Sequence, residues 1–124
     1  MAIKIGNAPC SWGVEWADDS RNPPWNTVLE ECHQAGYDGI ELGPVGFMPE
    51  DPEQLGDALA ENLLELIGGV VFQPFHDSSV SKTVMSQARR TARALVTHGA
   101  QQMVLIDSIS EARAPFAGRP SEAI

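Results

Sequence analysis

Short apolar runs alternate with amphipathic stretches along the whole chain. The apolar runs predict four strands, at residues 3–8, 37–42, 66–72 and 102–106. Between them, apolar residues recur at three- and four-residue intervals and predict helices at about residues 25–35, 52–61 and 80–98. This order is typical of consecutive βαβ units, in which right-handed crossovers join parallel strands. The pattern alone leaves open whether the sheet is an open doubly wound sheet or part of a barrel.

Capping residues mark the ends of the predicted helices. Asn22 is the N-cap candidate for the first helix, and Asp51, followed by proline, is the candidate for the second. Gly36 and Gly99 suit the left-handed position after the first and third helices, and Asn62 suits it after the second.

Each predicted helix has one apolar face, and we expect that face to be buried. The residues at the corresponding spacing are Trp25, Val28, Leu29 and Cys32, then Leu55, Ala58 and Leu59, then Val84, Ala88, Ala92 and Leu95. The continuous runs IGGVVF and MVLI suit strands that are covered on both faces.

Composition narrows the function classes. The chain has 124 residues, enough for one domain, and a net charge of -9 that disfavours nucleic acid and anionic membranes as partners. No run approaches the roughly 18 to 20 apolar residues of a membrane span, so we expect a cytoplasmic protein. Cys10 and Cys32 lack metal-site or redox spacing and are expected to be reduced thiols. Residues 50–65 contain six acids and no base, and residues 82–93 contain four bases and no acid, so we expect these neighbouring helices to attract each other; a basic docking surface on the third helix is the alternative.

The carboxyl ends of parallel strands are where ligands bind in α/β folds, and polar residues follow all four predicted strands. No nucleotide-binding, zinc-protease or serine-hydrolase motif accompanies them, and no metal site is expected within this chain. The candidates are Asn7, Trp12 and Gly13 after the first strand, Glu41 after the second, His76 after the third and Asp107 after the fourth.

Each candidate has more than one interpretation. Glu41 alternates with two apolar neighbours and should face the barrel interior, as a general base, a hydroxyl acceptor or half of a buried ion pair. His76 is either a proton-transfer or oxygen-binding group, or a loop histidine that caps a helix or faces solvent. Trp12 either forms an apolar wall for a sugar, which we favour, or plugs the barrel mouth. Asp107 either contacts substrate or begins the next segment.

Three segments, IGNAPCSWGVEW, PWNTVLEECHQAGYDGIELGPVGFMPEDPEQL and IGGVVFQPFHD, resemble the xylose isomerase-like barrel superfamily. They are most similar to inosose dehydratase and its sugar-phosphate isomerase/epimerase relatives, and the resemblance runs to about residue 107. It implies that residues 1–124 form a partial domain, the N-terminal half of a (β/α)8 TIM barrel with about four parallel strands alternating with three helices.

The resemblance also implies a function. Such enzymes bind a divalent metal, manganese or cobalt, and act on a small polyol ketone or sugar, as in the dehydration of 2-keto-myo-inositol in inositol catabolism. The positions that carry over are substrate-facing: Trp12, Gly13, Glu41 and His76. The family's metal ligands, two glutamates, an aspartate and a histidine, come from the second half of the barrel. We therefore expect this chain alone to be inactive.

A half barrel exposes unpaired strand edges, so we expect self-association or pairing with a C-terminal half. The alternative function, from outside the enzymes, is a noncatalytic half-barrel that binds a polyol or a partner subunit. Membership of the DNA-repair endonuclease branch of the superfamily is a third candidate. The net charge of -9 and the lack of a basic groove disfavour it, because DNA is itself negatively charged.

Overall fold

The computed structural model describes residues 2–119 and shows one parallel sheet with the strand order β1-β2-β3-β4. The strands are β1 (Gly6–Asn7), β2 (Gly39–Glu41), β3 (Glu65–Gln73) and β4 (Met103–Asp107). The α-helices are α1 (Trp25–Gln34), α2 (Pro52–Glu61) and α3 (Ser81–Thr97), and the short 3₁₀ turns are η1 (Pro9–Trp12), η2 (Ser78–Val80) and η3 (Ala114–Phe116). The α/β class is confirmed, because sequential parallel strands alternating with helices form the arrangement of half a (β/α)8 barrel.

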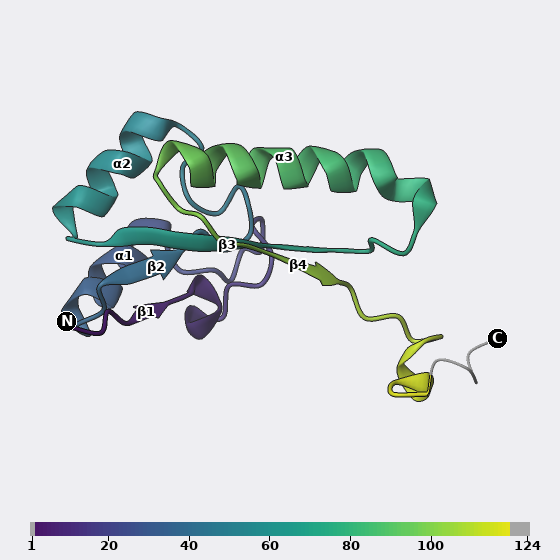
Figure 1. Cartoon of the computed structure of the whole chain (residues 1–124). Coiled ribbons are helices and arrows are strands. Elements are labelled where there is room, and N and C mark those ends of the chain that lie inside the picture. The colour runs from purple at the N-terminus through teal and green to yellow at the C-terminus, as the bar shows by residue number, and fades with distance from the viewer. Residues whose placement is uncertain (1, 120–124) are drawn as a thin grey trace.

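The core lies between the helices and one face of the sheet, and α3 runs along β3 with α2 beside it (Figure 1). Gly69 of β3 allows this close packing, since a Cβ atom there would lie 3.2 Å from the side chains of Thr91 and Leu95. The predicted buried faces are largely confirmed. The fully or nearly buried helix residues are Val28, Leu29, Cys32, Leu55, Leu59, Val84, Thr91 and Leu95, whereas Trp25, Ala58, Ala88 and Ala92 are half-buried.

Of the five predicted helix caps, Asp51, Gly36 and Gly99 are confirmed, Gly99 with φ of 78° after α3, whereas Asn22 and Asn62 are wrong. Asp51 caps α2, because its Oδ2 accepts a hydrogen bond of 2.9 Å from the main-chain N–H of Gln54. Gly36 adopts the left-handed conformation after α1, with φ of 88°. Asn22 is not a cap, since α1 begins after Pro24 and the Asn22 amide instead donates to the carbonyl oxygen of Trp16 at 2.6 Å.

The end of α2 also differs from the prediction. Asn62 has φ of -94°, and its side-chain amide donates back to the carbonyl oxygen of Ala58 at 2.8 Å. The left-handed residue is Leu63, with φ of 53°, whose side chain is 74% exposed. The chain thus turns one residue later than predicted, at a position where a side chain is conformationally disfavoured.

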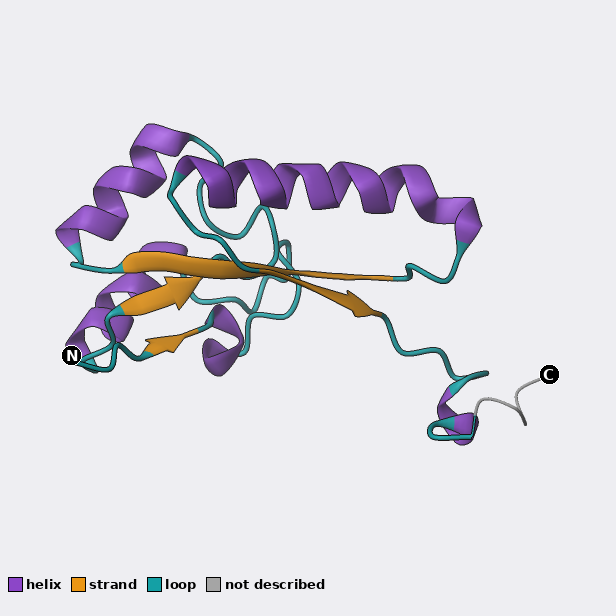
Figure 2. Ribbon diagram, in the orientation of Figure 1, coloured by secondary structure: helices purple, strands orange, loops and turns teal. Residues whose placement is uncertain are grey.

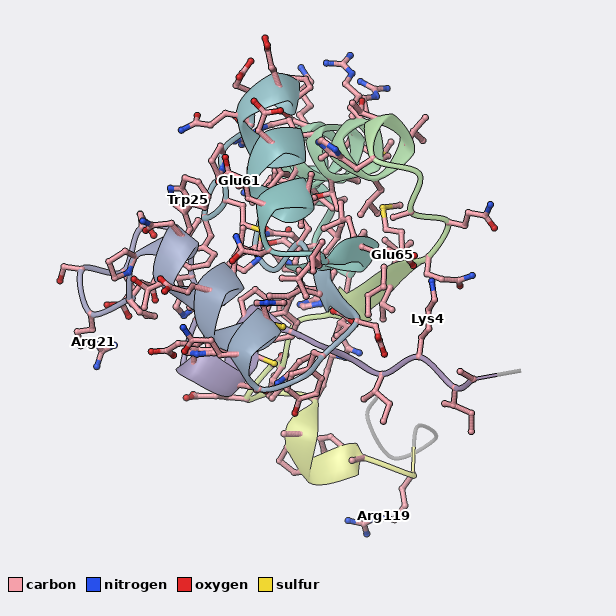
Figure 3. All side chains as sticks on the ribbon, turned by 90° about the vertical axis from the view of Figure 1, so that its left-hand side faces the viewer. Lys4, Arg21, Trp25, Glu61, Glu65 and Arg119 are labelled. Carbon is pink, nitrogen blue, oxygen red and sulfur yellow. The ribbon has the colours of Figure 1, made fainter. Side chains whose placement is uncertain are left out.

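β1 is shorter than predicted, with only Gly6 and Asn7 in register with β2. The preceding residues are held in other ways: Asp38 accepts from the main-chain N–H of Ile5 through Oδ2, and its own N–H donates to the Ile5 carbonyl at 2.8 Å. Lys4 pairs with Glu65 at the start of β3 (Figure 3).

The expectation that β4 is covered on both faces is wrong. Val104 and Leu105 point to opposite faces of the sheet and are 50% and 56% exposed. Figure 2 shows why: β4 lies at the edge of the sheet, and no described element packs beyond it.

Three smaller expectations can be checked directly. Arg90 of α3 donates to Glu50, next to α2, so the opposite charges of the two segments do attract each other. Cys10 and Cys32 are free thiols, the first exposed and the second buried, as predicted. Within residues 2–119, no helix has the length and apolar character to cross a membrane.

Candidate functional site

A pocket of about 740 Å³ opens where β2 and β3 meet the loop that follows β1. Its walls come from the segment around η1, the end of β2, the second half of β3 and the inner turns of α3. Gly43, just after β2, is buried and adopts φ of 70° against Pro9. This tight turn brings the β2 loop over the η1 segment and shapes one side of the pocket.

The aromatic wall of the pocket is formed by Trp16 and Phe72 rather than by Trp12. The Trp16 and Phe72 ring centroids lie 6.2 Å apart, with the ring planes at 41°. Trp12 packs against the core, and its Nε1 donates to Glu31 of α1 at 2.7 Å. No sequence signal separates the two tryptophans, since both belong to the same loop.

Glu41 lies at the end of β2, and its half-buried side chain lines the pocket. Its neighbours Ile40 and Leu42 are buried on the helix side, which confirms the alternation predicted from sequence. Within residues 2–119, the Glu41 carboxylate has no hydrogen bond and no ion pair, so the ion-pair alternative finds no partner in the described chain. The half-buried Glu41 carboxylate, at a largely apolar wall and without a partner in the described chain, is therefore available to accept hydrogen bonds from a ligand.

Polar side chains from β3 and α3 form another part of the lining, which the sequence analysis did not single out. Gln73 Nε2 donates to Gln87 Oε1 at 3.0 Å. Thr91, 1% exposed, donates from its hydroxyl to the Gln87 carbonyl at 2.9 Å. The only sequence signal was the position of Gln73 at the exit of the third strand, because the contribution of α3 depends on how the helix packs.

His76 and Asp107 are brought together at the ends of β3 and β4. His76 Nδ1 lies 2.6 Å from Asp107 Oδ1, which also accepts from the His76 main-chain N–H at 3.2 Å. The second carboxylate oxygen, Oδ2, accepts from Arg113 just before η3. The hydrogen bond to His76, followed by that to Arg113, holds the pKa of the Asp107 carboxyl well below its usual range.

The structure does not bring Glu41 and His76 together. Glu41 is in register with Gly68, whereas Asp107 is in register with Gln73, five residues further along β3. At about 3.3 Å per residue this is roughly 16 Å along the strand. Figure 2 shows the same displacement, with β3 and β4 extending beyond the ends of β1 and β2.

Asn7 and Gly13 shape the loop after β1 and do not line the pocket. Asn7 Oδ1 accepts from the main-chain N–H of Ala8 at 2.8 Å and from the Ser11 hydroxyl at 2.6 Å. Gly13, with φ of 81°, ends the η1 turn. Both therefore act on the conformation of the loop that carries Trp16.

The residues of the described chain do not fit the divalent metal that the resemblance implies. Between residues 2 and 119 there is no group of three or more histidine, cysteine, aspartate or glutamate side chains placed to hold an ion.

The fold and the pocket define a class: a parallel α/β half-barrel unit with a ligand-sized cavity at the carboxyl ends of its strands. Comparison of the chain with protein-family models gives no match, and comparison with curated proteins gives none either.

Proposed function

We propose that this chain forms the substrate-binding half of a cytoplasmic enzyme that converts a small sugar or polyol ketone, a lyase or isomerase most like inosose dehydratase. The observation that carries the proposal is the Glu41 carboxylate, which lines an aromatic-walled pocket without a partner in the described chain. The sequence resemblance supplies the substrate class.

The pocket suits a polyhydroxylated ligand. Its volume of about 740 Å³ lies within the usual range for small-molecule sites. Trp16 and Phe72 offer ring faces for the C–H side of a sugar, while Gln73 and Gln87 offer amide groups for its hydroxyls. Glu41 adds a hydrogen-bond acceptor, which together with the amides gives both donors and acceptors.

Complete turnover is expected to need the second half of the barrel, but the first step, removal of a proton beside the ketone, needs only a base in this pocket, and Glu41 is the residue that we expect to move that proton. Its carboxylate removes the proton from the carbon next to the ketone, and the electron pair of that C–H bond passes to the carbonyl oxygen as an enediolate. Expulsion of a hydroxyl from the following carbon, with the proton returned to form water, gives dehydration. Return of the proton to the former carbonyl carbon, with the hydroxyl proton of the enediolate passing to the former carbonyl oxygen, gives isomerisation instead. No step is assigned to a metal, because the described residues form no ligand cluster for one.

The test follows solvent exchange and binding. The chain is incubated in D₂O with 2-keto-myo-inositol or a ketose, with and without Mn²⁺ or Co²⁺, and deuterium incorporation beside the carbonyl is followed by NMR. Calorimetry measures binding in parallel. We expect Glu41→Gln to bind within a few-fold of wild type and to lose at least about 100-fold in exchange rate, the usual scale of a lost general base. Glu53→Gln, an exposed change on α2, is the matched control.

Absence of both binding and exchange in the wild-type chain would refute the proposal. Binding without exchange would instead favour the second candidate, a noncatalytic half-barrel that binds a polyol and pairs with a second copy or a separate half. The exposed apolar residues of β4 support that candidate, because an uncovered strand edge is a ready surface for pairing.

A further inference from the structure

Asp107 joins three parts of the chain at the far end of the sheet. It is the last residue of β4, and it contacts His76 in the loop after β3 and Arg113 in the segment before η3. The β3–β4 pairing continues to this level, since the Ser108 N–H donates to the Gln73 carbonyl at 3.0 Å. The carboxylate therefore has a fixed place on the sheet.

The proton in the His76–Asp107 contact can be located. The pKa of Asp107 lies well below its usual range, because His76 and then Arg113 donate to the carboxylate, so Asp107 is ionised at neutral pH. An ionised carboxylate only accepts hydrogen bonds, and Nδ1 of His76 must therefore be the donor at 2.6 Å. A neutral ring with Nδ1–H has a bare Nε2.

Nε2 is free to meet a ligand. The His76 side chain is 35% exposed, and Nε2 has no hydrogen-bond partner among residues 2–119. Both oxygens of Asp107 are already used, one by His76 and the other by Arg113. Direct contact with substrate is one of the two roles that the sequence suggests for Asp107. Because both of its oxygens are occupied, Asp107 is poorly placed for that role and well placed to orient the His76 ring.

We propose that Asp107 is a positioning residue that holds His76 in the Nδ1–H tautomer and presents Nε2 as a proton acceptor to a bound ligand. The nature of that ligand rests on the proposed function: a hydroxyl group of a sugar or polyol. The O–H bond of the ligand breaks as its proton passes to Nε2, and the oxygen keeps the electron pair as an alkoxide. The resulting imidazolium keeps its hydrogen bond to Asp107, and the reverse transfer returns the proton to the oxygen. Glu41 lies roughly 16 Å away along β3, so a small sugar or polyol that contacts His76 does not reach Glu41, and the hydroxyl that meets Nε2 belongs to a ligand at the far end of the sheet, outside the Glu41 pocket.

The other charges around the ring do not compete for this role. Asp77 is adjacent in sequence, but its carboxylate accepts from the Ser79 N–H at 2.9 Å and the Ser79 hydroxyl at 2.6 Å. These bonds are the main cause of the lowered pKa of Asp77, and the charge of His76 is the smallest contribution. Arg113 balances the charge of Asp107 from the side opposite the imidazole.

The tautomer can be read by two-dimensional NMR of the ring nitrogens at a pH where the imidazoles are neutral. The chain has three histidines, so His33 and His98 serve as internal controls. In the wild-type chain we expect His76 to show a protonated Nδ1 and a bare Nε2, with widely separated nitrogen resonances. In Asp107→Ala the two resonances should move toward each other as the tautomers mix, and in Arg113→Ala they should stay apart.

Some results would overturn the inference. A protonated Nε2 in the wild-type chain, or an unchanged His76 spectrum in Asp107→Ala, would do so. If the His33 and His98 resonances also move, the alanine variant has lost its fold, and Asp107→Asn, which keeps the side-chain volume, decides in its place. A chain that neither binds a ketose or polyol nor exchanges its proton refutes the proposed function, while the tautomer result still decides the role of Asp107.

Discussion

At the scale of single residues, glycines at two positions illustrate how backbone conformation and space decide what a site tolerates. Gly43 adopts φ of 70°, and a Cβ there would lie 2.8 Å from the Pro9 ring. Gly56 lies inside α2, where a Cβ would make an ordinary contact of 3.6 Å with His98. The same substitution should therefore have opposite effects at the two positions.

We expect Gly43→Ala to lower the free energy of unfolding by roughly 1 to 3 kcal/mol, because it combines left-handed strain with a clash. Gly56→Ala should raise it by up to about 1 kcal/mol, because alanine is the better helix former. Urea unfolding followed by circular dichroism measures both. Destabilisation of similar size by the two variants would contradict this account of Gly43.

At the scale of elements, the inner face of the sheet is packed by a side chain of one strand lying over glycines of its neighbours. Ile67 of β3 occupies the space beside Gly6 of β1 and Gly39 of β2. A Cβ on Gly39 would overlap Ile67 Cγ2 and lie 3.0 Å from the Glu65 carbonyl oxygen. The three strands thus depend on one another at this layer.

A double-mutant cycle tests this dependence. Gly39→Ala alone should destabilise the chain by about 1 to 3 kcal/mol, the usual cost of overpacking. Combined with Ile67→Ala, it should cost less than the sum of the two single variants, by at least about 0.5 kcal/mol, since the side chain that clashes is gone. Additive costs would mean that the Glu65 carbonyl, and not Ile67, limits the space.

The link between β4, the β3–α3 loop and the η3 segment should depend on pH. The pKa of Asp107 is lowered from 3.8 in the folded chain, so the stabilisation is fully present above about pH 4 to 5 and is lost as the pH falls through the folded value. Asp107→Asn should therefore have a lower free energy of unfolding than the wild-type chain at pH 6. The difference should shrink as the pH falls toward 2, because the wild-type carboxylate then becomes protonated. Denaturant unfolding over about pH 2 to 6 measures it, and a difference that stays constant on acidification would exclude the ionised contact.

At the scale of the whole molecule, the sheet has one well covered face and one poorly covered edge. The helices bury the strands from one side, whereas Val104, Leu105 and Ile106 of β4 are 42% to 56% exposed. Unpaired, apolar edge strands promote association between chains. The net charge of -9 opposes this only at long range, and salt weakens the opposition.

We expect concentration-dependent self-association of the chain that grows with salt, measured by sedimentation velocity. Val104→Lys should reduce it at least about 10-fold, because it places a charge on the exposed strand. Val96→Lys is the matched control, since it adds the same charge at a position that is 77% exposed on α3 and is not part of the strand. Equal effects of the two variants would show that net charge alone governs association.

The sequence by itself determined the order and type of the elements and most of the buried helix faces. These features depend on local periodicity and capping, and Asp51, Gly36 and the face of Val28, Leu29 and Cys32 illustrate them. The local pattern assigned Asn22 and Asn62 wrongly as caps. In the structure each side-chain amide instead donates to a preceding main-chain carbonyl, that of Trp16 and that of Ala58. It also placed Glu41 correctly on the face opposite its apolar neighbours.

Only the tertiary structure decided which side chains meet. Strand register brought Asp107 to His76 and kept both apart from Glu41, and register is a property of pairing that a strand's own sequence does not contain. The packing of α3 on β3 brought Gln87 to Gln73, and the loop conformation placed Trp16, not Trp12, against Phe72. Local pattern therefore specified the elements, while contacts between residues far apart in the chain made the site.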